Sequence, residues 1–143
     1  MITISKAKVK ESQKIRKLEQ KIWKEQNITS VYEAATFVEN GHTFIAKDAG
    51  KIIGAIIAIN TSDNKIRVVD WVVDEKYRGL SIGERLYKRL IKAINNTPIV
   101  TLIDTKNKAS INGHKKLGFK IIKKIKDPYS LGRNEYWFLM KRG

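Results

Sequence analysis

One short stretch, YRGLSIGE at residues 77–84, constrains the fold of this chain most strongly. It follows a strand pattern over residues 66–74 and precedes an amphipathic helix pattern over about residues 83–95. Glycines between a strand and a helix predict a tight turn, because Gly79 and Gly83 can adopt backbone conformations that a side chain would forbid. Ser81 between them is small enough not to block an anion. The fold must therefore contain a strand, a glycine-punctuated turn and a helix in direct succession.

Two chemical interpretations fit this turn. Gly79 to Gly83 matches G-x-S-x-G, the nucleophile elbow of serine hydrolases, and Ser81, Asp104 and His114 follow in the usual chain order of that triad. However, the strands before the turn read as antiparallel hairpins, no HGGG-type loop precedes it, and the chain is short for that fold. The alternative is a phosphate cradle, in which backbone N–H groups at a helix N-terminus bind an anion beside Arg78. The cradle accounts for more of the residues, and a plain tight turn remains the third option.

Composition narrows the chemistry further. The chain has 143 residues, no cysteine and two histidines, which suits a single domain over residues 1–143 and predicts neither disulfides nor a metal centre. Its formal net charge of +15 favours polyanionic partners, although a lysine-rich genome would produce the same excess. No apolar run approaches the roughly 20 residues of a membrane span, and the N-terminus lacks a signal pattern. We therefore expect a cytoplasmic protein that does not bind membranes.

Hydrophobic periodicity predicts the order β, α, α, three strands, α, β, α, two strands. The expected strands are residues 2–5, 43–47, 52–59, 66–74, 98–104, 119–125 and 135–141, and the expected helices begin near residues 11, 31, 83 and 107. Strand 98–104 should run parallel to strand 66–74, because a helix connects them. The class is α+β, with a mixed, mostly antiparallel sheet of about six to seven strands flanked by four helices.

The turn also carries a family signature. Arg78, Ser81 and Gly83 form R-x-x-S-x-G, which resembles motif A of the GNAT N-acetyltransferase superfamily, usually written Q/R-x-x-G-x-G/A. Serine stands here where glycine is commoner. The resemblance covers the whole chain in element order, and it implies the GNAT fold with a splayed parallel pair of central strands.

A second segment supports the same family. Residues 107–119 resemble the pattern N-x-x-A-x-x-x-Y-x-x-x-G-F, in which Asn107, Gly118 and Phe119 match. Ser110 and His114 replace the usual alanine and tyrosine. Two motifs at family spacing, each in the expected strand and helix context, are a specific signal.

The resemblance implies acetyl-CoA as acyl donor and no metal. The pyrophosphate would lie on the N–H groups from Gly79 to Gly83, and the pantetheine would lie beside the end of strand 66–74. There a backbone N–H near Val73 would hold the thioester carbonyl, and Asn107 would contact the pantetheine arm. The implied cofactor-binding residues are Trp71, Val72, Val73, Arg78, Gly79, Leu80, Ser81, Ile82, Gly83, Asn107 and His114.

Candidate catalytic groups follow from the same resemblance. His114 stands at the position of the family tyrosine that protonates the departing thiolate, and an imidazole with an ordinary pKa near 6.5 could do so. The alternative is that His114 packs and the thiolate leaves unaided. Asp70 and Asp104 are candidate general bases, although a surface salt bridge is the commoner fate of an aspartate. Glu33, on the short second helix, is a candidate substrate-binding residue, and we interpret His42 as a turn residue.

The resemblance implies an acetyl-CoA-dependent N-acetyltransferase that acts on a primary amine by direct attack in a ternary complex. The amine would belong to a protein N-terminus, a lysine or a small molecule. The loop at residues 127–129 and the aromatic-rich segment 135–140 resemble GNAT enzymes that acetylate protein N-termini, although these aromatic residues could equally belong to the core. The alternatives are a non-catalytic acetyl-CoA-binding module and a basic nucleic-acid-associated protein. Residues 106–126 hold eight lysines and no acid, which favours docking on an acidic or RNA-containing assembly or a merely solvated face. The resemblance also allows a homodimer paired through the last strands.

Overall fold

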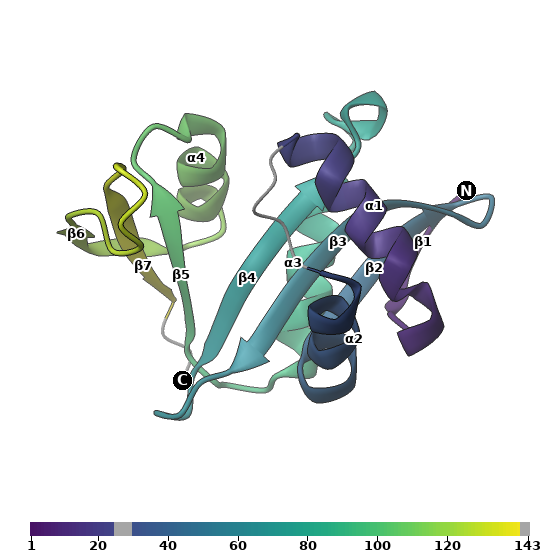
Figure 1. Ribbon diagram of the computed structural model, residues 1–143, viewed down its shortest axis with the longest axis horizontal. Coiled ribbons are helices and arrows are strands. Elements are labelled where there is room, and N and C mark those ends of the chain that lie inside the picture. Colours follow the sequence, from purple (N-terminus) through teal and green to yellow (C-terminus); the bar gives the residue numbers. More distant parts are fainter. Residues whose placement is uncertain (25–29, 141–143) are drawn as a thin grey trace. The chain divides into compact units, whose positions relative to one another are not determined.

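The computed structural model describes residues 1–24 and 30–140 of the chain. They form strands and helices in the predicted order, with two 3-10 helices, η1 (Val9–Glu11) and η2 (Glu75–Tyr77), in addition (Figure 1). The elements are β1 (Ile2–Lys6), α1 (Ser12–Trp23), α2 (Val31–Asn40), β2 (His42–Asp48), β3 (Lys51–Asn60), β4 (Ile66–Val73), α3 (Ile82–Ala93), β5 (Ile99–Asp104), α4 (Lys108–Lys116), β6 (Lys120–Ile125) and β7 (Glu135–Met140). Residue 141, the predicted end of the last strand, lies outside the described residues.

The strands form one sheet in the order β1-β2-β3-β4-β5-β7-β6. Strand β2 is antiparallel to β1 and β3, and β7 is antiparallel to β5 and β6. Strands β4 and β5 are parallel, with Ile66 opposite Ile99 and Arg67 opposite Val100. The predicted mixed sheet with a parallel central pair and four flanking helices is thereby confirmed, while the splaying of that pair stays a prediction.

His42 corrects one expectation. It is not a turn residue but the first residue of β2, where it lies opposite Ala58. Helix α2 ends at Asn40, and Gly41 closes it by donating its N–H to the Phe37 carbonyl, so the chain is already extended at His42.

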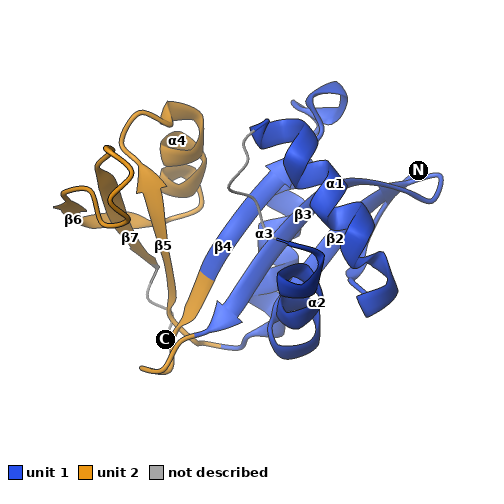
Figure 2. Ribbon diagram, viewed as in Figure 1, with its two compact units in different colours: residues 1–60, 68–95 blue, residues 61–67, 96–143 orange. Residues whose placement is uncertain are grey.

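Contacts divide the chain into two compact units (Figure 2). The first comprises residues 1–60 and 68–95, and the second comprises residues 61–67 and 96–143. Strand β4 contributes its first two residues to the second unit and the remainder to the first. No helix among the described residues is long and apolar enough to span a bilayer.

In the first unit, helices α1 and α2 cover one face of the strands and α3 covers the other (Figure 1). The helical periodicity of α1 explains its orientation, because Ile15 and Leu18 are buried while Lys14 and Lys17 are exposed. Helix α3 is buried through Leu86, Tyr87 and Leu90, each 0% exposed. The core on the α1 side comprises Ala7, Ile15, Leu18, Val38, Ile45, Ile52, Ala55, Ile57 and Val72.

A buried carboxylate fixes the end of β4. Asp74 is 2% exposed, and its Oδ2 lies 2.7 Å from the Nζ of Lys21 on α1. Its amide donates to the Ile53 carbonyl on β3 at 2.8 Å, and its Oδ1 accepts from the Lys76 amide. The hydrogen bonds from Lys21 and from the Lys76 amide lower the pKa of Asp74 below its ordinary value of 3.8. The chain that follows β4 is therefore held to both α1 and β3 where the glycine-punctuated turn begins.

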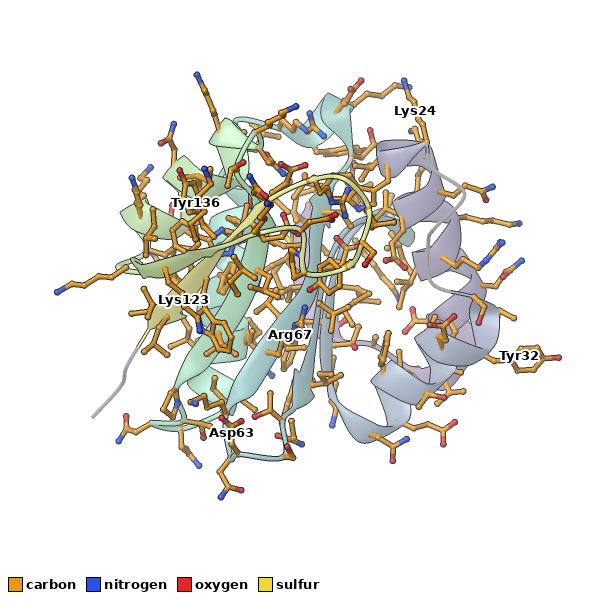
Figure 3. The ribbon with its side chains drawn as sticks, turned by 60° about the vertical axis from the view of Figure 1, so that its left-hand side comes forward. Lys24, Tyr32, Asp63, Arg67, Lys123 and Tyr136 are labelled. Carbon is orange, nitrogen blue, oxygen red and sulfur yellow. The ribbon has the colours of Figure 1, made fainter. Side chains whose placement is uncertain are left out.

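In the second unit, α4 packs against β7. His114 of α4 contacts Phe119 and Phe138, with ring centroids 5.0 and 5.9 Å away. Side chains of residues that pair across neighbouring strands lie on the same face of the sheet. Phe138 faces α4, so the residues next to it on β7 and their partners on β5 and β4 lie on the opposite face. We call it the Arg67 face, and it carries Arg67, Val100, Leu102, Asp104, Glu135 and Trp137. Figure 3 shows Arg67 on β4 and Lys123 on β6, where the Lys123 ammonium lies 5.3 Å from the Trp137 ring centroid.

Candidate active site

The turn between β4 and α3 is presented by a rigid entry. Asp74 caps η2, and the Tyr77 hydroxyl donates to Asp48 Oδ2 at 2.7 Å, which raises the pKa of Tyr77. Arg78 then turns back so that its Nε lies 3.4 Å from the Val73 carbonyl. From Arg78 to residue 81 every residue is exposed. The chain before the turn is therefore fixed by the contacts of Asp74 and Tyr77, and residues 78–81 that follow it are exposed.

The sequence predicts unusual backbone conformations at Gly79 and Gly83. The structure has left-handed conformations at Gly79 and Ser81, whereas Gly83 lies in α3 without one. Gly79 has φ +81° and Ser81 has φ +59°. A left-handed conformation costs a non-glycine residue roughly 1–2 kcal/mol, which explains why the family pattern more often has glycine where Ser81 stands. Ser81 is also the N-cap of α3, and its side chain makes no capping hydrogen bond.

Gly83 is required for a different reason, which is close packing inside α3. A Cβ built on Gly83 would lie 3.1–3.3 Å from three atoms of the Trp71 ring. Trp71 cannot easily move away, because its Nε1 donates to the Gly83 carbonyl at 2.9 Å and its ring stacks edge-on against Tyr87 at 4.7 Å. The glycine therefore lets the first turn of α3 lie directly on the end of β4.

This arrangement suits an anion. The first amides of an α-helix have no carbonyl partner within that helix, and the helix dipole places partial positive charge there. Because Ser81 does not cap them with its side chain, and Arg78 is exposed beside them, the turn combines backbone donors with a guanidinium. This is the chemistry that binds a phosphate.

Asp70 is held on β4 by two donors. Its carboxylate accepts from Trp23 Nε1 at 3.1 and 3.3 Å, and its Oδ1 also accepts from the amide of Trp71 at 2.9 Å. The residue is half-buried. These contacts leave lone pairs on the carboxylate for a further donor, and the general-base role of Asp70 stays a prediction.

Asn107 and His114 lie on α4 in the second unit. Asn107 is the N-cap, and its Oδ1 accepts from the Ser110 amide at 3.2 Å. His114 is 2% exposed, and its Nδ1 lies 2.7 Å from the Ser110 carbonyl. The polar groups of both residues are engaged within the same helix.

The environment of His114 removes the basis for a general-acid role. Burial lowers its pKa to about 4, and the hydrogen bond to the Ser110 carbonyl offsets this in part. The prediction assumed an ordinary pKa near 6.5, with both protonation states accessible at neutrality. At pH 7 the folded chain instead holds a neutral imidazole between aromatic rings. Hydrogen bonding also weakens the serine-hydrolase interpretation. His114 Nδ1 is engaged with the Ser110 carbonyl of its own helix, and Asp104 Oδ1 accepts from the Lys106 amide.

Glu33 has a local structural task. Ser30 Oγ accepts from the Glu33 amide and Glu33 Oε1 accepts from the Ser30 amide, both at 3.2 Å, which is a reciprocal capping box at the start of α2. The sequence contained this signal, since a serine followed three residues later by glutamate marks a helix N-terminus. A substrate-binding role for Glu33 stays a prediction.

The sequence matches the acetyltransferase (GNAT) family over residues 11–119. An N-alpha-acetyltransferase from Sulfurisphaera tokodaii is 32% identical over 120 residues, which cover 73% of this chain and 68% of that protein. The chain belongs to the GNAT acetyltransferase family. It is therefore an N-acetyltransferase.

Solved structures agree with the fold. Ard1 from Thermoplasma volcanium superposes with a TM-score of 0.88 at 20% identity, covering 99% of this chain and 98% of that one. Arabidopsis thaliana Naa50, in complex with the bisubstrate analogue CoA-Ac-MVNAL, superposes with a TM-score of 0.81 at 19% identity, covering 98% of both chains. The seven-stranded sheet with four helices is the GNAT fold.

Sequence reasoning missed one residue of this GNAT chain, Glu135 on β7. It is 4% exposed, its Oε2 has no hydrogen-bond partner, and burial raises its pKa. It lies beyond the residues matched to the family, and nothing in the pattern of β7 distinguishes a buried glutamate from an exposed one. The Arg67 face also carries a pocket of about 120 Å³, lined by Arg67, Val100, Leu102 and Trp137 together with residues of the β3–β4 turn. Among residues 1–24 and 30–140, no group of three or more acidic, histidine or cysteine side chains could hold a metal ion.

The Trp71–Gly83 contact predicts a sign change in a double-mutant cycle. Gly83→Ala should lower the free energy of unfolding by about 1–3 kcal/mol, the usual cost of overpacking. In a Trp71→Phe background the crowded indole atoms are absent, and the same change should instead raise it by up to about 1 kcal/mol, because alanine favours a helix over glycine. Denaturant unfolding of the four proteins measures both steps. A loss of equal size in both backgrounds would contradict the packing explanation.

His114 predicts an acid-dependent loss of stability. Because its pKa is about 4 in the folded chain and near 6.5 in an unfolded one, the unfolded state takes up protons first as the pH falls. Stability should therefore be full above pH 6.5 and decline towards pH 4, by an amount on the order of 3 kcal/mol. Unfolding free energies of wild type and His114→Phe across this range test it. The variant should lack this decline, whereas Phe119→Leu, which removes a neighbouring ring and no titrating group, should keep it. Parallel curves for wild type and His114→Phe would refute the assignment.

Proposed function

We propose that this GNAT enzyme transfers the acetyl group of acetyl-CoA to the α-amine at the N-terminus of a protein or peptide. The observation that carries the proposal is its 32% identity with an N-alpha-acetyltransferase. The likeness to Naa50, crystallised with a CoA–peptide conjugate, supports the same acceptor class.

The donor site in this proposal is the turn that joins β4 to α3. The pyrophosphate of acetyl-CoA lies on the amides from Gly79 to Gly83, and Arg78 supplies a charged fork. The positive φ at Gly79 and Ser81 and the exposure of the segment support this placement. The pantetheine follows the end of β4, where the amide near Val73 receives the thioester oxygen.

The chemical step needs one proton acceptor and no protein acid. The neutral amine attacks the thioester carbon, the carbonyl oxygen becomes an oxyanion, and its collapse breaks the carbon–sulfur bond and releases CoA as thiolate. The nitrogen then loses its extra proton to a base. Asp70 is the candidate, because it is half-buried on β4 and its carboxylate can accept a further hydrogen bond. A thiolate is a good leaving group, because thiols are much stronger acids than alcohols, and the low pKa of His114 is therefore no obstacle.

A specific observation favours a second candidate, a GNAT-fold module that binds acetyl-CoA without turnover. The family tyrosine is absent, and the residue at its place, His114, is buried and neutral at pH 7. Under this alternative the chain binds acetyl-CoA but acetylates no amine. Lysine side chains and small amines remain alternative acceptors of an active enzyme.

Calorimetry tests the donor site. Wild-type protein should bind acetyl-CoA saturably, and Arg78→Ala should bind about 10-fold to 100-fold more weakly, which corresponds to one charge-assisted bidentate contact. Arg16→Ala removes a comparable charge from α1 and should leave the affinity near the wild-type value. Equal weakening in both variants would point to the general positive field instead of the turn.

Mass mapping of the product tests the acceptor. A peptide with one free N-terminus and one internal lysine, incubated with acetyl-CoA, should gain one acetyl group on the α-amine. Acetylation of the lysine would replace the proposed acceptor class. Tight acetyl-CoA binding without transfer to any amine would favour the non-catalytic module.

A further inference from the structure

Two buried polar atoms without a hydrogen-bond partner lie two residues apart at the start of β7. They are the Nε of Arg133 and the Oε2 of Glu135. Buried donors and acceptors are almost always paired, and an unpaired carboxylate oxygen is especially costly. Glu135 is 4% exposed, so water does not solvate its carboxylate freely. Such a pair calls for a physical explanation.

The neighbours of Glu135 do not neutralise it. Its cross-strand partner on β5 is another carboxylate, Asp104. Burial raises the pKa of Glu135 most, Arg133 lowers it, Asp104 raises it and Arg67 lowers it, and the pKa remains raised. Arg67 also has another partner, because its guanidinium donates to the hydroxyl of Tyr129 in the loop between β6 and β7. The Glu135 carboxylate therefore still lacks a cationic hydrogen-bond donor at Oε2.

The two orphaned atoms have opposite hydrogen-bond character. Oε2 accepts and the guanidinium Nε–H donates, and Arg133 lies close enough to Glu135 for its charge to lower the pKa of that carboxyl. A ligand that satisfies both must offer a cationic donor and a neutral acceptor a few bonds apart. The first residue of a peptide does so, because its ammonium group is followed by its carbonyl oxygen. The ε-ammonium of a lysine side chain has no carbonyl at that spacing.

We propose that Glu135 and Arg133 form a binding site for the acceptor's amino terminus, in which Glu135 Oε2 accepts from the ammonium and Arg133 Nε donates to the first carbonyl. This inference rests on the proposed function and adds the residues that select an α-aminoacyl group. Asp104 adds negative charge at the same site. Because Oε2 is covered, the Glu135 side chain or a neighbour must move to admit the ligand, and the gain of a partner by an unpaired buried charge offsets that movement.

The conservative variant Glu135→Gln separates a binding role from a structural one. It keeps the shape and removes the charge. A raised carboxyl pKa means that the folded state is fully stable only below the ordinary value of 4.5 and loses stability as the pH rises through the raised pKa. At pH 7 the variant should therefore melt at a higher temperature than wild type. An ion pair with Arg133 or Arg67 that served the fold would give the opposite shift.

Peptide binding should change in the other direction. The probe is a lysine-free tetrapeptide with a free amino terminus. It is titrated into CoA-saturated protein to measure affinity, and in a separate assay it is incubated with enzyme and acetyl-CoA to measure acetylation. Glu135→Gln should weaken its affinity and raise its KM about 10-fold or more, with the acetyl-CoA affinity unchanged. Arg133→Met should weaken binding of the tetrapeptide more than binding of an alkylamine, because the alkylamine has no carbonyl for Arg133 to contact. Glu39→Gln, which alters an exposed carboxylate on α2, should match wild type in every assay.

The outcomes distinguish this site from the proposed function. If wild type acetylates the tetrapeptide and Glu135→Gln does so with equal KM, the site is wrong and the function stands. A lowered melting temperature in Glu135→Gln likewise overturns the site, because it assigns the carboxylate to the fold. If wild type binds acetyl-CoA but neither binds nor acetylates the tetrapeptide, both the site and the proposed acceptor fall.

Discussion

The close contact between Trp71 and Gly83 is the constraint on which the donor site depends. An indole hydrogen-bonded to a helix carbonyl, with no room for a Cβ between them, fixes where α3 begins relative to the end of β4. Asp74 adds a second restraint by tying the next residues to α1 and β3. The exposed segment between these two fixed points, Arg78 to Ser81, can then adopt left-handed conformations that aim backbone donors outward.

Most polar side chains proposed as functional turn out to be committed to local structure. Glu33 closes a capping box, Asn107 caps α4 and His114 bonds to the carbonyl four residues before it. Such commitments stabilise helices, and they also lower the capacity of these groups to meet a ligand. Arg78 and Glu135 differ, because the first is exposed beside the turn and the second is buried with an unpaired oxygen. Function in this chain is best sought where the fold leaves a polar group unsatisfied.

The sequence was sufficient to predict the fold because the patterns were local. The continuous apolar run of residues 52–59 and the helical spacing of Leu86 and Leu90 each fix one element, and the order of elements fixes the sheet. The turn at residues 77–84 was located correctly, but the role of Gly83 was not, since crowding by Trp71 depends on a packing contact that no spacing encodes.

The site was less predictable for the same reason. The pKa of His114 depends on how deeply α4 buries it, and the unpaired oxygen of Glu135 depends on which residues the register of β5 and β7 brings opposite. Neither the pKa of His114 nor the missing partner of Glu135 follows from residue type. The capping role of Glu33, in contrast, could have been predicted from Ser30 three residues before it.

The central claim is that the backbone of the turn between β4 and α3 binds the pyrophosphate of acetyl-CoA. The most direct measurement is the change in backbone amide chemical shifts as CoA is titrated into isotopically labelled protein. The account predicts the largest shifts at the amides of Gly79 to Gly83, with smaller shifts when pantetheine, which lacks the pyrophosphate and the nucleotide, replaces CoA. Saturable binding that leaves these five amides unmoved would contradict it.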